Sequence, residues 1–353
     1  MKPSNTLALI ALAALQLACS GSEQELNDAQ MDESVGLAGG GQATGNLLPV
    51  NAEILDLRPD PNPSRNAYFG DLHVHTAYSF DAYAFGTTNT PDDAYRYAKG
   101  EALAHPSGYQ VQLQQGLDFY AVTDHAMFLG VVKEAADTDS EFSRYAVAKP
   151  LHNINAPNNM TESSLISRGR NFAAFVPETL AGVLDGSIDA GLVEAITKSA
   201  WRDSIRAAND AYEPGRFTTF AAFEYTSSTN RRGNLHRNVI FKDTERLPAV
   251  PFSRFNSQNP EGLWGWMDGL RDQGIESLAI PHNANGSNGQ MFKLEDWAGN
   301  PLDDAYATQR IRNEPLVEIT QIKGTSDTHP LLSPNDEWAD FEIYKLRVGT
   351  NLP

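Results

Sequence analysis

The sequence contains a single cysteine, Cys19, in a chain of 353 residues. With Cys19 set aside, the domain that follows has no disulfide, no thiolate metal ligand and no cysteine nucleophile. A Gly-x-Ser-x-Gly motif is missing as well, so covalent catalysis has no visible candidate. Any bound metal must therefore be held by histidine, carboxylate and water.

Basic residues are scarce, because 27 lysines and arginines stand against 45 aspartates and glutamates, which gives a net charge of −18. A polyanion would be repelled by such a chain, so we expect no nucleic-acid partner. The hydrophobic fraction of 41% is ordinary for a soluble globular protein. The length is sufficient for one large domain or two ordinary ones, and either would bury a sizeable core.

The first residues are typical of an export signal. Lys2 is followed by an apolar run from Leu7 to Leu17, which is too short to span a membrane. Ala18 and Cys19 then resemble the end of a bacterial lipoprotein signal, although Gln16 stands where that signal prefers leucine. We expect residues 1–19 to be a lipoprotein-type signal peptide whose lipidated Cys19 anchors the protein to a membrane of the bacterial cell envelope, in the outer membrane or periplasm. An ordinary cleaved secretory peptide is the alternative.

The rest of the chain divides into two parts. Residues 20–66 have Gly39-Gly40-Gly41 and no sustained apolar periodicity, which predicts a disordered tether. Residues 67–353 alternate apolar runs with helical periodicities, as in α/β folds with parallel strands. Residues 128–198 do not fit this alternation well, and we expect them to be an insertion that roofs the site.

Two helices can be predicted from their end signals. Asn259-Pro260-Glu261 predicts the start of a helix that Gly274 would end, followed by a short strand over Ser277–Ile280. A second helix is expected around residues 201–212, with Pro214 as its stop. A further strand is expected over residues 316–322.

Potential metal ligands follow several of the apolar, strand-like runs. Side chains alternate along a strand, so His73 and His75 face the same way and can bind one ion. Parallel strands would bring ligands from their ends to one rim of a barrel or sheet. A lone His-x-His is a weak signal, and the order of the later ligands strengthens it. These strand-end residues are His73, His75, Asp124, His125, Glu224 and His282.

Glu224 and His236 also have structural interpretations. Phe220, Ala222 and Phe223 predict that Glu224 is buried, where a charge needs a partner. His236 lies among polar residues in a plausible loop, so a surface role is as compatible with the sequence as ligation.

The order of these motifs resembles the polymerase and histidinol phosphatase (PHP) superfamily, and in particular its branch called the domain of unknown function 3604. The resemblance covers about Ala67 to the C-terminus. It implies an α/β fold, a distorted (β/α)7-type barrel, possibly incomplete at the C-terminus, with two or three divalent ions (Zn, Mn or Fe) at the strand ends. The motifs that carry the resemblance are Asp71-Leu72-His73-Val74-His75-Thr76, Thr123-Asp124-His125, Phe223-Glu224, Leu235–Phe241, Pro260–Trp264, Ile280-Pro281-His282-Asn283-Ala284-Asn285 and Gln321–Gly324.

The resemblance also implies a set of ligands, which are His73, His75, His125, Glu224, His236 and His282, with Asp81 at the place of a further ligand. The superfamily's closing motif has a local candidate in Gly324-Thr325-Ser326-Asp327-Thr328-His329. Either Asp327 and His329 complete the site, or the protein is shortened and its site is partly built. The early end of the chain favours the second alternative.

The implied chemistry is hydrolysis by a metal-bound hydroxide. Two ions about 3.5–4 Å apart would lower the pKa of a bridging water and bind the oxygens of an in-line displacement at phosphorus. Arg237 and Lys323 are the cations expected to bind a phosphate. Asp124 is expected to orient a ligand histidine.

Three functions remain open from the sequence. The first is an exported or lipid-anchored metal-dependent phosphoesterase that acts on a small-molecule or other phosphate-ester substrate. The second is an amidohydrolase-like enzyme that attacks an amide or lactone, a class that normally adds a strand lysine and a late aspartate as ligands. The third is a shortened binding protein without catalytic activity.

Overall fold

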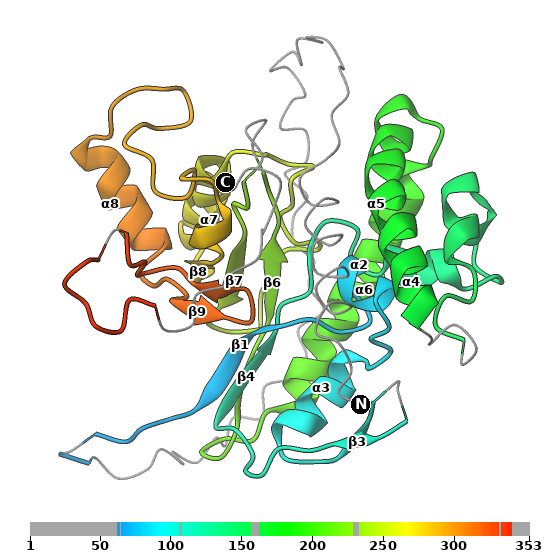
Figure 1. The fold of residues 1–353 in the computed structure, drawn as a ribbon, viewed down its shortest axis with the longest axis horizontal. Helices are drawn as coiled ribbons and strands as arrows, with labels where there is room; N and C mark the ends of the chain where they lie inside the picture. The colour runs from blue at the N-terminus through cyan, green and yellow to red at the C-terminus, as the bar shows by residue number, and fades with distance from the viewer. Residues whose placement is uncertain are drawn as a thin grey trace.

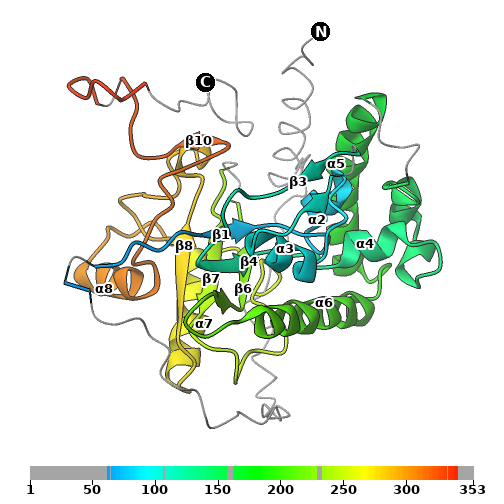
Figure 2. The same cartoon turned by 90° about the horizontal axis from the view of Figure 1, so that it is seen from below.

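The fold, in a computed structural model, is a mixed arrangement of helices and strands. The structure describes residues 62–340 apart from 64, 106–107, 157–161, 229–232 and 332. Figure 1 shows the main strands in the middle of the molecule, with α7 and α8 to one side and α2, α4, α5 and α6 to the other; Figure 2 shows the same division from below. The predicted signal peptide, Cys19 and nearly all of the predicted tether lie outside the described residues. No helix among the described residues is both long and apolar enough to cross a lipid bilayer.

The main strands form two three-stranded sheets. The first has the order β1-β4-β5 with all pairs parallel, and the second has the order β6-β7-β8 with both pairs antiparallel. Two short antiparallel hairpins, β2-β3 and β9-β10, lie outside these sheets. The strands are β1 (Gly70–Val74), β2 (Leu103–Ala104), β3 (Gln110–Val111), β4 (Phe119–Val122), β5 (Thr218–Phe220), β6 (Ala222–Tyr225), β7 (Arg237–Phe241), β8 (Ser277–Pro281), β9 (Thr320–Gln321) and β10 (Gly324–Thr325).

The two sheets are joined where β5 passes into β6. Only Ala221 separates these strands, and the chain beyond β4 continues to pair with them through a parallel bridge between His125 and Glu224. The Glu224 amide donates to the Asp124 carbonyl and the Ala126 amide to the Glu224 carbonyl, both at 2.9 Å. The residues after β4 and the end of β6 are therefore held side by side by backbone hydrogen bonds.

Strand direction decides which chain segments meet at one edge. β4 runs parallel to β1 and to the β5–β6 segment, and β6 and β8 are both antiparallel to β7. The ends of β1, β4, β6 and β8 therefore lie at the same edge, and β7 begins there. This places His236, the residue before β7, beside the residues that follow the other strands.

The helices are in part those that the sequence predicts. Asn259 caps α7, accepting a hydrogen bond from the Glu261 amide, and Gly274 follows the helix with φ +79°. α6 ends before Pro214 as predicted but begins eleven residues before Trp201, at Ala190. The helices are α2 (Phe80–Ala84), α3 (Pro91–Ala98), α4 (Val131–Ala136), α5 (Glu162–Asp185), α6 (Ala190–Ala211), α7 (Pro260–Arg271) and α8 (Asp304–Asn313), with 3-10 turns η1 (Phe142–Arg144), η2 (Ala146–Leu151) and η4 (Ala284–Gly286).

The structure leaves the predicted barrel untested and contains only part of one predicted strand. The described strands form no closed barrel, so the distorted (β/α)7 barrel remains a prediction. Of the strand predicted over residues 316–322, the structure has only the two residues of β9.

Residues 128–198 contain α4, η1, η2, α5 and the start of α6, and their apolar side chains pack into one core with Phe80 of α2. This helical segment thereby packs against α2 and stabilises its position.

A buried ion-pair network connects β7 with α7 and the end of α8. The Arg237 Nε lies 2.7 Å from Glu314 Oε1, and the side chains are 2% and 1% exposed. Trp264 donates its indole N–H to the same oxygen at 2.8 Å, and Arg310 Nε lies 3.2 Å from Glu314 Oε2. Strand alternation turns Arg237 to the side opposite His236. Arg237 is therefore part of the core and is not placed to bind a phosphate beside His236.

Replacing Arg237 by alanine should lower the free energy of unfolding by about 3 kcal/mol, because Glu314 would keep a buried charge with one arginine in place of two. Urea unfolding followed by circular dichroism measures this. The matched control is Arg216→Ala, whose side chain is 85% exposed beside Glu213 and whose loss should leave the urea midpoint unchanged. Equal midpoints for the two variants would contradict a structural role for the buried pair.

Candidate metal centre

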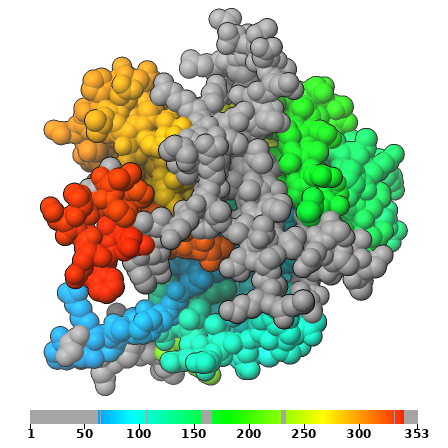
Figure 3. All heavy atoms as spheres, in the orientation of Figure 1, coloured from blue at the N-terminus to red at the C-terminus, as the bar shows by residue number. Residues whose placement is uncertain are grey.

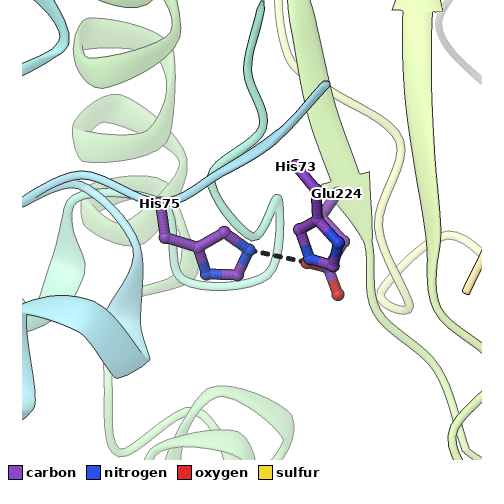
Figure 4. Close-up of side chains that lie close together, drawn as sticks. All are labelled: His73, His75 and Glu224. Carbon is purple, nitrogen blue, oxygen red and sulfur yellow. Dashed lines mark hydrogen bonds and ion pairs between the residues drawn. The ribbon is translucent and has the colours of Figure 1, made fainter. Parts of the chain in front are cut away.

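The end of β1 brings two imidazoles to one carboxylate. His75 Nε2 lies 2.8 Å from Glu224 Oε2, and His73 Nε2 lies 3.5 Å from the same oxygen. Figure 4 shows the His75 ring directed at the Glu224 side chain, which the His73 ring overlaps in this view. The two histidines come from the end of β1 and the residue after it, as the His-x-His spacing predicts. The ring centroids of His73 and His75 are 5.4 Å apart. This carboxylate therefore lies where both rings converge.

The second oxygen of Glu224 is surrounded by three more imidazoles. Glu224 Oε1 lies 2.7 Å from His236 Nδ1, 3.3 Å from His125 Nδ1 and 3.3 Å from His282 Nε2. The Glu224 side chain is 1% exposed. Five of the eight histidines of the chain thus contact one buried carboxylate.

Asp81 extends the cluster on the side of α2. The helix begins directly after the turn that follows His75, and Asp81 lies in its first turn. Its carboxylate oxygens lie 3.1 Å from His75 Nδ1 and 3.4 Å from His125 Nε2. Phe80 stacks on the His125 ring with the centroids 4.5 Å apart, which fixes the ring plane. The structure thus brings Asp81 to the place that the resemblance suggests.

Glu318 also joins the cluster, and the sequence analysis does not identify it. Its Oε2 lies 2.7 Å from His73 Nδ1, and its backbone N–H donates to the Pro281 carbonyl at 3.1 Å. The segment that carries Glu318 therefore runs beside the end of β8. The available signal was an acidic residue inside an apolar run, between Val317 and Ile319. A strand over residues 316–322 accounts for this pattern without indicating which way the Glu318 carboxylate points.

The two most buried acids of the cluster carry their charge in spite of burial. Burial alone would raise the pKa of Glu224, but the nearby imidazoles outweigh it and hold that pKa well below its usual range. The pKa of Asp81 is likewise held well below its usual range, because His75 and His125 outweigh the effect of burial. Both groups are therefore carboxylates at neutral pH, which is the form that binds a metal.

The imidazoles fall into two groups. Burial lowers the pKa of His236 to about 4 and that of His282 to about 3, with the charge of His73 adding to the effect at His282. Burial opposes the charged forms of His73 and His75 too, but the carboxylates beside them outweigh it and raise both pKa values. His236 and His282 are therefore neutral near pH 7, whereas His73 and His75 keep a proton to higher pH than a free histidine does when no metal is bound.

Several buried atoms at the centre of the cluster have no hydrogen-bond partner within the described part of the chain. They are Glu224 Oε1, His236 Nε2 and both ring nitrogens of His282. The short contacts around Glu224 Oε1 thus lack hydrogen-bond geometry, although the groups are buried, where unpaired polar atoms are costly. Imidazole nitrogens and carboxylate oxygens that converge without bonding to one another fit the ligand set of a divalent ion.

Sets of three ligand atoms lie close enough together to hold an ion. In each set the atoms are all within 4.8 Å of one another. Glu224 belongs to two of them, and His73, His75 and His125 also belong to two each. The four sets are His73, His75 and Glu224; His73, His282 and Glu318; His75, Asp81 and His125; and His125, Glu224 and His236. These groups could therefore hold a metal ion, or more than one.

Asp124 contacts Thr76, and not the ligand histidine that the sequence predicts. Its carboxylate accepts hydrogen bonds from the Thr76 backbone N–H at 2.5 Å and from the Thr76 hydroxyl at 2.7 Å, and it bonds to no ligand histidine. Burial raises the pKa of Asp124 to about 6. Asp124 therefore fixes the backbone directly after His75, and so acts on the position of that ligand through the chain.

Asp327 and His329 lie away from the centre. Both side chains are exposed. Asp327 accepts a hydrogen bond from the Thr325 hydroxyl, and His329 Nδ1 accepts one from the Leu331 amide at 3.2 Å. Neither belongs to a set of converging ligands among the described residues. The turn of the β9-β10 hairpin instead brings Lys323 to the cavity beside the cluster.

That cavity has a volume of about 750 Å³ and opens on His73, His75 and Asp81. It lies between β1, the start of β4 and the segment that carries Glu318. Lys323 lines it, and is the single lysine or arginine among the described lining residues. A substrate in this cavity would thus meet one cation together with the ligand cluster.

Glu224→Gln should reduce the metal bound per chain at least about tenfold, because an amide cannot replace the charge that five imidazoles share. Inductively coupled plasma mass spectrometry of purified protein measures this. Glu245→Gln, at an exposed position, is the matched control and should keep the wild-type metal content. The same comparison separates His282→Ala, which should lose metal, from His329→Ala, which should not. Metal contents equal to wild type in both Glu224→Gln and His282→Ala would exclude this centre as the binding site.

Metal binding should release protons, about one or more per chain near pH 7, because His73 and His75 keep a proton to higher pH than a free histidine does until a metal displaces it. The raised pKa values set the sign. Release is largest where these histidines are protonated and disappears as pH rises above their pKa values. Titration calorimetry in two buffers of different ionisation enthalpy measures the number released. His75→Ala should release less and His329→Ala the same as wild type; no release near pH 7 would contradict the charge state assigned to the cluster.

Comparison with protein families gives one match. The model of a family described as a protein of unknown function, DUF3604, covers residues 62–351, a range that includes every residue of the cluster. No curated protein matches the chain, and no solved structure matches it. Because the matched range covers most of the sequence, the chain belongs to the DUF3604 family.

Proposed function

We propose that the protein is a metal-dependent phosphoesterase of the PHP type. The observation that carries the proposal is the buried Glu224 carboxylate with five converging imidazoles, next to a cavity that a substrate can enter. The donors are nitrogen and oxygen only, which suits Zn, Mn or Fe. The overlapping sets of ligands support two or three ions rather than one.

Bound divalent ions would supply Lewis acidity and an activated water for attack at phosphorus. The chain's own residues have three tasks around them. Asp81, Glu224 and Glu318 provide the negative charge of the site, and Asp124 and Phe80 keep His75 and His125 in place. Lys323 provides the positive charge that a phosphate oxygen can bind within the cavity.

The amidohydrolase-like alternative is less well supported by the arrangement of the residues. That class normally adds a lysine from a strand as a ligand, whereas Lys323 comes from the turn between β9 and β10 and lines the cavity. Glu224 contacts every histidine of the cluster instead. Export and lipid anchoring through Cys19, with the bacterial cell envelope as the location, remain part of the proposal, and they rest on the sequence alone.

Lys323→Ala should lower kcat/KM for aryl phosphate esters by about tenfold to a hundredfold, because a hydrogen bond to a charged oxygen contributes about 1.5–3 kcal/mol. The measurement is release of 4-nitrophenol from phosphate mono- and diesters with Mn, Zn or Fe added. Lys242→Ala, at an exposed position outside the cavity, is the control and should retain activity. Hydrolysis confined to carboxyl esters or lactones would support the alternative enzyme, and no hydrolysis by metal-loaded protein would support a binding protein.

A further inference from the structure

The cavity beside the metal centre extends well beyond the ligand cluster. Its lining includes Gly70, at the start of β1, as well as His75, just after its end. A strand rises about 3.3 Å per residue, so these two residues are about 16 Å apart along the chain. The volume of the cavity is about 750 Å³. This space is much larger than a phosphate group requires.

The part of the cavity away from the cluster has an apolar wall. Leu72 comes from β1, Phe119 from the start of β4 and Ile280 from β8. Leu316 and Val317 also line the cavity, from the chain segment that leads to Glu318. Figure 3 shows the blue surface of the β1 region directly beside the orange surface of the segment that carries β9. An apolar group of the substrate would lose contact with water along this wall.

The polar side chains that line the cavity belong either to the ligand cluster or to a further set, which is Asp71, Asn238, Thr320, Gln321 and Lys323. Burial lowers the pKa of His236 and the positive charge of Lys323 adds to this effect, so Lys323 lies on the side of the ligand cluster. The other charged lining residues are carboxylates or cluster histidines. Asn238 is 1% exposed, and its Nδ2 donates to the Leu72 carbonyl at 3.0 Å. Its Oδ1 is a buried acceptor that has no partner among the residues that the structure describes. Because Asn238 pairs with Glu224 across β6 and β7, it lies next to the cluster rather than at the far end. It could accept one hydrogen bond from a donor near the ester.

We propose that the substrate is a phosphate ester whose alcohol part is an extended apolar group that lies along β1. The phosphate would be at the cluster and Lys323, and the apolar group against Leu72, Phe119 and Ile280. Hydroxyl groups placed against these apolar side chains would lose their hydrogen bonds to water, which costs free energy. This inference rests on the proposed function for the phosphate, and goes beyond it by naming the class of alcohol.

The test is binding of n-alkylphosphonates, from methyl to octyl, to the purified metal-loaded protein. Titration calorimetry is done below the critical micelle concentration, so that the ligands are monomeric. Affinity should increase about threefold to fourfold for each methylene that enters the cavity, since burying one contributes about 0.8 kcal/mol. The increase should stop once the chain fills the available length. Equal affinity for methyl- and octylphosphonate would overturn the inference.

A pair of variants tests where the chain binds. Leu316→Asp places a charge in the cavity wall at a side chain that is 54% exposed, so folding should be unaffected. Ile311→Asp is the matched control, because Ile311 is 66% exposed on α8 and is not one of the lining residues. Leu316→Asp should abolish most of the dependence on chain length, and Ile311→Asp should retain it. The same dependence in both variants would overturn the inference.

Failure of the inference can be distinguished from failure of the proposed function. Alkyl 4-nitrophenyl phosphates with the same series of alkyl groups measure turnover independently of the phosphonate titrations. If short and long esters are hydrolysed equally well, the enzyme is a phosphoesterase and the apolar alcohol is excluded. If octylphosphonate binds tightly but no ester is hydrolysed, the apolar site stands and the phosphoesterase assignment fails.

Discussion

The structure depends on keeping one carboxylate ionised in a place that water does not reach. Burying a lone charge costs several kcal/mol, and partners must offset that cost. At Glu224 the partners are five imidazoles, which come from β1 and the residue after it, from the turn after β4, from the residue before β7 and from the residue after β8. Because these imidazoles also repel one another when protonated, divalent ions satisfy the whole cluster better than protons do.

Strand direction explains how residues so far apart in sequence meet. The strands β1, β4, β6 and β8 run in the same direction, so their C-terminal ends lie at one edge. This brings together four ligands at or near those ends, which are His75, His125, Glu224 and His282. The antiparallel β7 adds His236 from the residue before its start. The same strand turns the next residue, Arg237, into the core against Glu314. One strand therefore contributes both a ligand and a buried ion pair, on opposite faces.

Much of the centre could be predicted from the sequence, because it depends on local patterns. Apolar runs that end in His or Glu, together with the alternation of His73 and His75, identify ligands that the structure brings together. Glu318 was missed because its position depends on a backbone hydrogen bond to Pro281, which no local pattern indicates. Arg237 was assigned to the phosphate because it follows His236, although alternation places neighbours in a strand on opposite faces. Asp327 and His329 were candidates by motif alone, and the path of the chain after β10 leaves them exposed.

The most direct measurement of the central claim is anomalous X-ray diffraction from crystals of the protein, collected at the absorption edges of zinc, manganese and iron. The account predicts anomalous peaks between the Glu224 carboxylate and the surrounding imidazoles, at about 2.0–2.2 Å from the ligand atoms. A map without an anomalous peak at Glu224, in crystals of protein supplied with these metals, would contradict it.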